Sequence, residues 1–198
     1  MSQQMTATWP QILVDWYAEN KRMLPWRRTQ DAYHVWVSEI MLQQTRIEAV
    51  MGYYHRFMEA FPTVEDLASA PIEQVLKLWE GLGYYSRARN LHKAAQQVVE
   101  RGGFPSSYEE IVKLPGIGDY TAGAIASIAF DKPVPAVDGN VIRVVSRLRG
   151  IRENVAIPSV KRQITAEATA LVPQERPGDF NQALMDLGAT VCTPGTPS

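Results

Sequence analysis

The spacing of apolar residues along the chain predicts a series of helices separated by turns rich in proline and glycine. Apolar side chains recur at helical intervals in a first segment that runs from Thr8 to the break at residues 24–26, and then in 35–51, 71–78, 85–101, 120–130, 139–149, 160–172 and 180–191. No stretch alternates apolar and polar residues for long, and the β-prone segment 134–137 is interrupted by prolines. The pattern predicts an all-α fold of about ten helices.

The same pattern predicts which positions are buried. The expected core positions are Ile12, Leu13, Trp16 and Tyr17 in the first segment, Trp36, Ile40, Val50 and Met51 in 35–51, and Leu91, Ala94, Ala95 and Val98 in 85–101. The segment 120–130 is rich in small residues, which lets another helix approach closely. Two polar pairs, Thr63 with Asp66 and Ser106 with Glu109, have the three-residue spacing of a capping box, so we expect a helix to begin after each.

Composition and charge narrow the class of protein. A length of 198 residues with 45 % apolar residues suits a soluble protein of one large or two small domains. No apolar run reaches the roughly 20 residues that span a bilayer, and residues 1–8 lack a secretory pattern, so we expect a cytoplasmic protein without membrane contact. Because the net charge is −1, nucleic-acid binding needs a local basic face, for which the clusters at 21–28, 87–93 and 143–149 are candidates.

A glycine-rich turn, Leu-Pro-Gly-Ile-Gly at 114–118, joins two of the expected helices. Gly116 and Gly118 allow a sharp turn, and the following helix start presents free amides to an anion such as a DNA phosphate. Candidate ligands for a small cation are the backbone carbonyls of Val112, Leu114 and Ile117. An ordinary inter-helix loop is the alternative. A Rossmann-type site is disfavoured because no strand precedes the turn and a third glycine is missing.

Two carboxylates are candidates for chemistry. Asp138, about twenty residues beyond the turn, precedes Gly139 and Asn140 and is expected as an N-cap worth about 1 kcal/mol. Glu39 lies among apolar residues, either at the edge of a solvated face or in an apolar pocket, and spacing alone favours the solvated face. In a pocket, loss of hydration would raise the pKa of the Glu39 carboxyl and suit it to donate a proton near neutral pH.

Two longer motifs resemble a family of DNA-repair enzymes. The run 114–122, Leu-Pro-Gly-Ile-Gly-Asp-Tyr-Thr-Ala, resembles the helix-hairpin-helix of the endonuclease III-like DNA glycosylase superfamily. The run 38–45, Ser-Glu-Ile-Met-Leu-Gln-Gln-Thr, resembles the signature of MutY-type adenine glycosylases. The resemblance extends from Trp9 to Cys192 and implies a helical subdomain at 27–132, with the hairpin motif at about 111–126. It implies a second subdomain made of 1–26 and 133–198.

The resemblance implies a role for each candidate residue. Glu39 would protonate the adenine, Asp138 would face the positive charge that develops on the sugar, and Asn140 would orient Asp138 or bind substrate. Bifunctional members of the superfamily carry a lysine two residues after the second glycine, and its amine attacks the sugar. Here that position is Tyr120, so we expect base removal without efficient strand cleavage. Tyr120 would donate a hydrogen bond to Glu39 or the substrate, and simple packing at a helix start is the alternative.

Removal of a base from a duplex requires that the base be flipped out. The resemblance implies that Gln44 and Tyr84 wedge into the gap and that Gly116, Ile117 and Gly118 contact phosphates. It also implies an adenine pocket lined by Arg22, Trp26, Arg27, Leu42 and Gln182. Taken alone, Tyr84 and Tyr85 would be expected in the core, although the Gly-Leu-Gly before them favours an exposed turn.

The family also implies a [4Fe–4S] cluster on four cysteines, of which Cys192 would be the first. Cys192 is the only cysteine of the chain, which excludes an internal disulfide, and one thiolate cannot hold such a cluster. We therefore expect no cofactor that this chain completes, apart from the candidate cation at the hairpin. The sequence continues for six residues after Cys192, and we expect a fragment that lacks the rest of the cluster loop and the family's C-terminal domain for 8-oxoguanine recognition.

The sequence thus predicts a monomeric adenine DNA glycosylase that acts on double-stranded DNA, at adenine opposite 8-oxoguanine or guanine. Three alternatives stay open. One is a superfamily glycosylase for T:G mismatches or oxidised pyrimidines, which Glu39 and Tyr120 disfavour. Another is a non-catalytic DNA-binding fragment that uses only the hairpin. The third is a generic helical protein in which the motif is coincidental.

Overall fold

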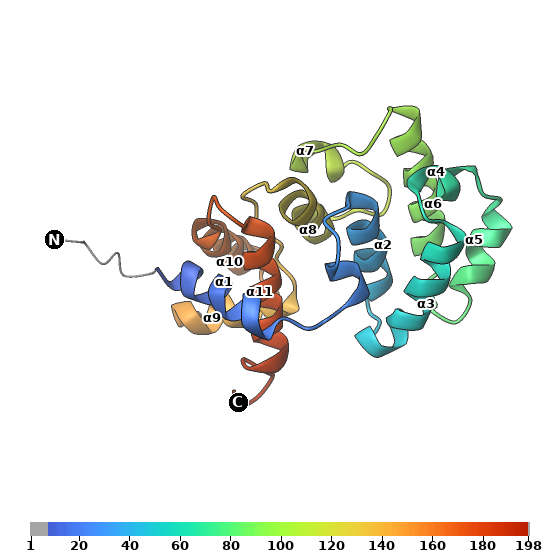
Figure 1. Ribbon diagram of the computed structural model, residues 1–198. Coiled ribbons are helices and arrows are strands. Elements are labelled where there is room, and N and C mark those ends of the chain that lie inside the picture. Colours follow the sequence, from blue (N-terminus) through green and yellow to red (C-terminus); the bar gives the residue numbers. More distant parts are fainter. Residues whose placement is uncertain (1–7, 198) are drawn as a thin grey trace. The chain divides into compact units, whose positions relative to one another are not determined.

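The protein is described by a computed structural model, which covers residues 8–197. The expectation that the chain has no secretory signal concerns residues 1–7, which lie outside the described part. Within residues 8–197 all regular secondary structure is helical, with eleven α-helices and one short 3-10 helix (Figure 1). The all-α prediction is confirmed, and the β-prone segment 134–137 forms no strand. None of the described helices is both long and apolar enough to cross a membrane.

The chain divides into two compact units. One consists of Met1–Met23 and Asp131–Ser198, and the other of Leu24–Phe130. We call these unit 1 and unit 2. Their limits differ by two or three residues from the division at 27–132 that the sequence predicts.

Unit 2 contains two buried helices, α2 (Ala32–Leu42) and α8 (Asp119–Phe130), that pack against each other (Figure 1). Every residue of 35–41 and of 121–128 is buried. Helices that are apolar on all sides are stable only when other elements cover them. The small residues of α8, as the sequence predicts, allow α2 to lie close to it.

The remaining helices of unit 2 are η1 (Pro25–Arg27), α3 (Ile47–Ala60), α4 (Val64–Ser69), α5 (Ile72–Trp79), α6 (Ser86–Glu100) and α7 (Tyr108–Ile111). Helix α3 packs on α2 and α5, α6 packs on α4 and α5, and α7 packs on α8. Three buried aromatic rings anchor α3: the Phe57 ring centroid lies 5.0 Å from that of Phe61 and 6.0 Å from that of Trp79.

The prediction of one helix over 35–51 is wrong, because the segment forms two helices. Helix α2 ends at Leu42, Gln44 adopts a left-handed conformation with φ 59°, and α3 begins at Ile47. No proline or glycine marks this break. The cause is tertiary: the guanidinium of Arg87, from α6, donates hydrogen bonds to three carbonyl oxygens at the end of α2. Side-chain donors therefore replace the backbone amides that would continue the helix.

Most of the expected core positions are buried, including those of α6, but Ile12 and Met51 are 56 % and 38 % exposed. Both lie beside the buried face of their helix rather than on it. Helix α3 buries Val50, Tyr54 and Phe57, which recur at intervals of four and three residues. Met51 follows this row by one position and turns towards solvent.

One of the two predicted capping boxes is confirmed. The Thr63 hydroxyl accepts from the Asp66 amide at the start of α4, while the Asp66 carboxylate accepts from the Thr63 amide. The prediction for Ser106 and Glu109 is wrong, since the N-cap of α7 is Ser107, which makes no side-chain cap. Its hydroxyl instead donates to the Glu110 carboxylate at 3.1 Å, so the polar pair is displaced by one residue.

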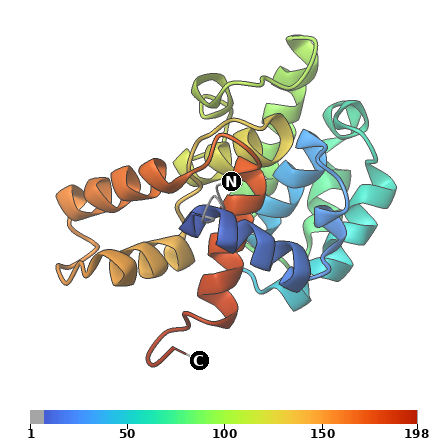
Figure 2. The same ribbon diagram turned by 60° about the vertical axis from the view of Figure 1, so that its left-hand side comes forward.

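Unit 1 consists of α1 (Trp9–Asn20), α9 (Gly139–Arg149), α10 (Pro158–Leu171) and α11 (Pro177–Thr190). Helix α11 packs on α1 and α9, and Figure 2 shows α9 and α10 side by side. The buried side chain of Asn181 in α11 accepts from the Ala136 amide at 3.1 Å and donates to the Val134 carbonyl at 2.9 Å. This amide gives the extended segment before α9 the backbone partners that a strand would otherwise supply.

Helices α9 and α11 approach most tightly at Gly188. A Cβ atom at this position would lie 2.6 Å from the Cβ and 3.1 Å from the Cα of Asn140, in the first turn of α9. Because the Cα belongs to the backbone, it cannot give way as a flexible side chain would. The close approach of the two helices therefore requires a residue without a side chain.

We expect Gly188→Ala to lower the free energy of unfolding by about 1–3 kcal/mol, the usual cost of forcing an extra methyl group into a packed contact. Urea unfolding measures this change. Gly139→Ala is the matched control, since a Cβ there meets no atom within 4 Å. Equal losses for the two variants would contradict the close approach.

The confirmed capping box yields a second test of stability. Thr63→Ala removes the acceptor for the Asp66 amide and should cost about 1 kcal/mol in urea unfolding. Ser107→Ala, at a helix start without a side-chain cap, should cost clearly less. A larger loss for the Ser107 variant would reverse the assignment of the two helix starts.

Candidate active site

Glu39 lies on α2 and is only 8 % exposed. Its neighbours along the helix, Ser38 and Ile40, are equally shielded from water. The prediction from spacing alone, that Glu39 lies on a solvated face, is therefore wrong. Helices α3, α6 and α8 all contact α2 and cover it. The carboxyl is therefore shielded from water, as the alternative expectation of a pocket requires.

The carboxyl of Glu39 has a hydrogen-bond donor from the other buried helix. The Tyr120 hydroxyl donates to Glu39 Oε2 at 2.6 Å. Tyr120 lies in the first turn of α8, two residues after Gly118. The hydrogen bond expected between the hairpin tyrosine and this glutamate is present, and it joins the hairpin directly to the buried acid.

The hairpin between α7 and α8 has the predicted turn geometry. Gly116 adopts φ 77°, and a Cβ at this position would lie 2.7 Å from the Cβ of Asn90 in α6. Gly116 and Gly118 are exposed, while Ile117 between them is buried and holds the turn on the protein. The exposed backbone leads directly into the N-terminus of α8, which is the arrangement that binds anions.

The cation predicted at the hairpin would rely on backbone carbonyls alone. Residues 8–197 contain no cluster of three or more His, Cys, Asp or Glu side chains able to hold a metal ion. Of the three predicted carbonyl ligands, that of Leu114 already accepts a hydrogen bond from the Ile117 amide at 3.1 Å. Coordination by Val112, Leu114 and Ile117 stays a prediction.

Asp138, in unit 1, is held by two hydrogen bonds at the start of α9. One carboxylate oxygen accepts from the Val141 amide at 2.8 Å, and the other accepts from the Asn140 side chain at 2.8 Å. The N-cap role is therefore confirmed. Because both oxygens have a partner on the same helix, the carboxylate has a fixed orientation, which a charge-stabilising role would also need.

Arg143 fixes Asn140 in turn. Its guanidinium donates to the Asn140 side-chain oxygen at 2.8 Å, to the Gly188 carbonyl at 2.6 Å and to the Cys192 carbonyl at 2.7 Å. A chain of hydrogen bonds thus runs from α11 through Arg143 and Asn140 to Asp138. This arginine, which the sequence places in a basic cluster, makes contacts within the protein.

The two predicted wedge residues share an unusual backbone conformation. Gln44 and Tyr84 are exposed, Tyr84 by 63 %, and both adopt positive φ, at 59° and 48°. The expectation of an exposed turn after Gly-Leu-Gly is confirmed. Residues with side chains seldom adopt this conformation unless their surroundings impose it.

The residues predicted to line an adenine pocket belong to different units. In unit 2, Trp26 is buried against Tyr54, while Arg27 and Leu42 are half-buried. In unit 1, Gln182 donates to the Gly178 carbonyl at 3.3 Å. The fifth predicted residue, Arg22, forms an ion pair with the buried Asp186 in the same unit. A common pocket formed by these five residues stays a prediction.

Sequence reasoning missed two polar groups that organise the site. Asp186 interrupts an apolar stretch of α11, and a buried carboxylate in such a place requires a cationic partner, so a signal was available. Arg87, expected only as part of a basic cluster, bonds to backbone carbonyls. Carbonyl partners have no signature in the sequence, so this role could not be inferred from it.

The residues of this chain do not fit a [4Fe–4S] cluster. Cys192 is its only cysteine, and four ligands are needed. The Cys192 sulfur accepts a hydrogen bond from the Arg147 guanidinium at 3.2 Å. No chemical step can therefore be assigned to such a group here.

Comparison with known proteins places the chain in a family. Residues 37–174, which include the hairpin and both carboxylates, match the family of HhH-GPD superfamily base excision DNA repair proteins. The chain is 52 % identical over 196 residues to an adenine DNA glycosylase of Rattus norvegicus, with 93 % of this chain and 38 % of the relative covered. An adenine DNA glycosylase of Arabidopsis thaliana is 48 % identical, with 94 % of this chain and 34 % of the relative covered. The chain thus spans little more than a third of the length of these relatives.

Solved structures agree with this assignment. A thermostable thymine-DNA glycosylase is similar with a TM-score of 0.85 and 30 % identity, over 95 % of this chain and 88 % of that one. A trapped endonuclease III–DNA covalent intermediate has the same fold, with a TM-score of 0.78 and 24 % identity, over 95 % of this chain and 86 % of that one. The hairpin, the fold and the matched residues together establish that this chain belongs to the HhH-GPD superfamily of base excision DNA repair proteins.

Proposed function

We propose that this protein is an adenine DNA glycosylase of base excision repair, which hydrolyses the bond between adenine and deoxyribose. The observation that carries the proposal is the buried Glu39 carboxyl, bonded to Tyr120 of the helix that follows the hairpin. Relatives at 52 % and 48 % identity that bear the name adenine DNA glycosylase support it.

Glu39 acts as the general acid. Adenine is a poor leaving group as an anion, and protonation at N7 lets it depart as a neutral base. A carboxyl group that is shielded from water is favoured in its neutral, proton-carrying form. The Tyr120 hydroxyl, 2.6 Å from Oε2, remains as a hydrogen-bond donor when Glu39 has released the proton. The pair can therefore supply a proton and stabilise the carboxylate that results.

Asp138 stabilises the sugar. Loss of the base leaves an oxocarbenium-like centre, and a carboxylate facing it offsets the developing positive charge. The bonds from Val141 and Asn140 hold the Asp138 carboxylate in one orientation before the reaction. Such preorganisation lowers the cost of stabilising charge in the transition state. Water then attacks the sugar and leaves an abasic site.

The hairpin and the two exposed turns bind the substrate. The hairpin residues Gly116, Ile117 and Gly118 contact phosphates without reading sequence. The donors are the amides of Gly116 and Gly118, because the Ile117 amide already bonds to the Leu114 carbonyl. Gln44 and Tyr84 enter the duplex as the adenine leaves the stack. We infer double-stranded DNA with adenine opposite 8-oxoguanine or guanine as the partner, bound by a monomer in the cytoplasm, with the adenine held by Arg22, Trp26, Arg27, Leu42 and Gln182.

Thymine removal from T:G mismatches is a second candidate function. The similar solved structure of a thymine-DNA glycosylase favours it, because that protein shares the fold over nearly its whole length. The two candidates differ in what they require of residue 39. Removal of adenine needs a proton at a ring nitrogen, and Glu39 would supply it. Removal of thymine does not impose this requirement on residue 39.

We expect Glu39→Gln to lower the single-turnover rate of adenine release by at least about a hundredfold, the usual contribution of a general acid. Asp138→Asn should lower it similarly while the fold persists, because asparagine is also a good N-cap. Duplexes with A:8-oxoG, A:G and T:G pairs provide the substrates.

Glu48→Gln, an exposed glutamate in the first turn of α3, is the matched control and should release adenine at the unaltered rate. Full activity in both the Glu39 and Asp138 variants would discard the mechanism. Release of thymine from T:G without release of adenine would replace the proposal by the second candidate.

The tyrosine in place of the hairpin lysine yields a test of strand cleavage. Because Tyr120 has no amine, borohydride should trap no substantial covalent adduct, and strand breaks should appear only after alkali treatment. Tyr120→Phe should leave this pattern unchanged and slow base release, since the donor to Glu39 is lost. Strand cleavage at the same rate as base release would overturn the expectation of a monofunctional enzyme.

A further inference from the structure

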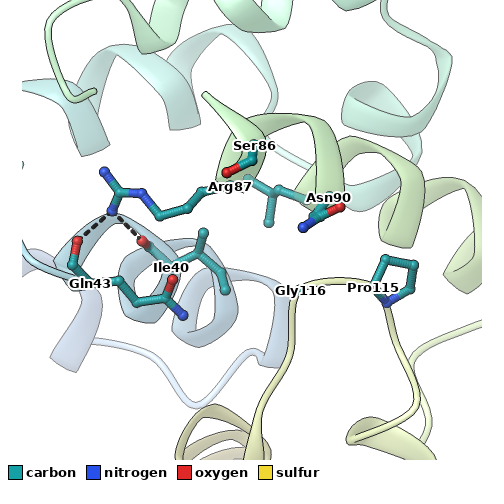
Figure 3. Close-up of a pocket in the computed structure, with 8 residues that line it drawn as sticks. Ile40, Gln43, Ser86, Arg87, Asn90, Pro115 and Gly116 are labelled. Carbon is teal, nitrogen blue, oxygen red and sulfur yellow. Dashed lines mark hydrogen bonds between the residues drawn. The ribbon is translucent and has the colours of Figure 1, made fainter. Parts of the chain in front are cut away.

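The guanidinium of Arg87 connects two separate loops of unit 2. Its Nη1 donates to the carbonyls of Ile40, Met41 and Gln43 at 2.8, 3.2 and 2.6 Å. Its Nη2 donates to the carbonyls of Leu82 and Gly83 at 3.1 and 3.2 Å. Figure 3 shows the side chain reaching from α6 to the end of α2, where it bonds to Ile40 and Gln43. One side chain thus holds the turn after α2 and the turn before α6.

The surroundings of this arginine differ from those of an ordinary surface or ion-paired residue. No acidic side chain of the described residues pairs with it, and its Nε is buried without a hydrogen-bond partner. Burial lowers the pKa of the Arg87 guanidinium from its ordinary value, so the charge is held at a cost. The rings of Trp79 and Tyr84 lie 5.4 and 5.6 Å from its central carbon and cover it.

The Arg87 side chain also lines a hollow of unit 2, together with Ile40, Gln43, Asn90, Pro115 and Gly116 (Figure 3). The contacts of its guanidinium that can be named are the carbonyl bonds and the two aromatic rings.

Each loop that Arg87 holds contains one exposed residue other than glycine with positive φ. Gln44 directly follows Gln43, and Tyr84 directly follows Gly83, so each lies next to a carbonyl that the guanidinium bonds. A residue with a side chain keeps this costly conformation only when the structure around it imposes it. The Tyr53 hydroxyl lies close to the second turn, since a Cβ at Gly81 would lie 2.1 Å from its oxygen.

We infer that Arg87 is a positioning residue for base extrusion, which fixes Gln44 and Tyr84 relative to each other before DNA binds, so that both enter the duplex as one rigid wedge. The inference rests on the proposed function, because it assigns a purpose to the two exposed residues. Arg87 contacts no base and acts through the backbone of both loops. Ordering the loops in advance removes the entropic cost of ordering them on the DNA.

Arg87→Lys tests this inference, since lysine keeps the charge but its single ammonium cannot span two loops as a guanidinium does. The measurement compares adenine release from a paired duplex with release from a duplex in which the adenine is bulged and already outside the stack. We expect a loss of about tenfold or more on the paired substrate, from the lost bonds to a charged group, and little change on the bulge. Arg101→Lys, at the exposed C-cap residue that follows α6, is the control and should change neither rate.

A second measurement separates this inference from the proposed function. A 2-aminopurine at the extruded position reports unstacking by its fluorescence without any bond cleavage, and the Glu39→Gln background removes the chemical step. When the protein that keeps Arg87 binds this DNA, the fluorescence of 2-aminopurine should rise. In the Arg87→Lys variant this rise should be smaller. Hydrogen exchange in the free protein should become faster in 43–46 and 81–85 of the Arg87 variant and stay unchanged in the rest of unit 2.

Three results would overturn the inference about Arg87. Equal losses of adenine release on paired and bulged DNA would mean a general structural defect. The other two are an unchanged fluorescence rise, and exchange rates in the two loops that match those of the wild type. If the wild type extrudes the base but releases no adenine, the proposed reaction fails while the role of Arg87 in extrusion stands.

Discussion

The hydrogen bond between Tyr120 and Glu39 is the interaction on which the rest of the candidate site depends. A carboxyl on a helix that is buried along its whole central part requires a polar partner, since an unpaired buried polar group is costly. The hydroxyl of Tyr120 meets this requirement at 2.6 Å. Because Tyr120 lies in the first turn of the helix that follows the hairpin, the same bond joins the proposed acid to the backbone that is proposed to contact DNA phosphates. In the proposed mechanism, DNA binding and proton donation therefore share one pair of packed helices, α2 and α8.

The second carboxylate, that of Asp138, is held by hydrogen bonds at a helix N-terminus. Asp138 caps α9, and its two oxygens are bonded by the backbone and side chain of that helix. Asn140 is in turn bonded by Arg143, and Gly188 lets α11 approach this turn closely. A residue that stabilises a helix thus also has a carboxylate of fixed orientation. Structural and chemical roles need not exclude each other at this position.

Local patterns were sufficient for much of the fold. Helical periodicity and proline and glycine positions predict most helices, and the capping pair of Thr63 and Asp66 is found where expected. The break between α2 and α3 could not be predicted, because it depends on Arg87, which is far away in sequence. The burial of Glu39 was missed for a related reason: it depends on three other helices that cover α2. The motif at 38–45 is sufficient to identify Glu39 as the candidate acid. Its burial depends on tertiary contacts, which the motif does not contain.

In the proposed mechanism, Glu39 transfers a proton to the adenine ring as the base departs. The most direct test compares single-turnover release of adenine with that of 7-deazaadenine, which has carbon in place of the N7 acceptor, from otherwise identical duplexes. If the proton goes to N7, 7-deazaadenine should be released at least about a hundredfold more slowly although the duplex still binds. Equal rates of release for the two bases would show that the base departs without protonation at N7.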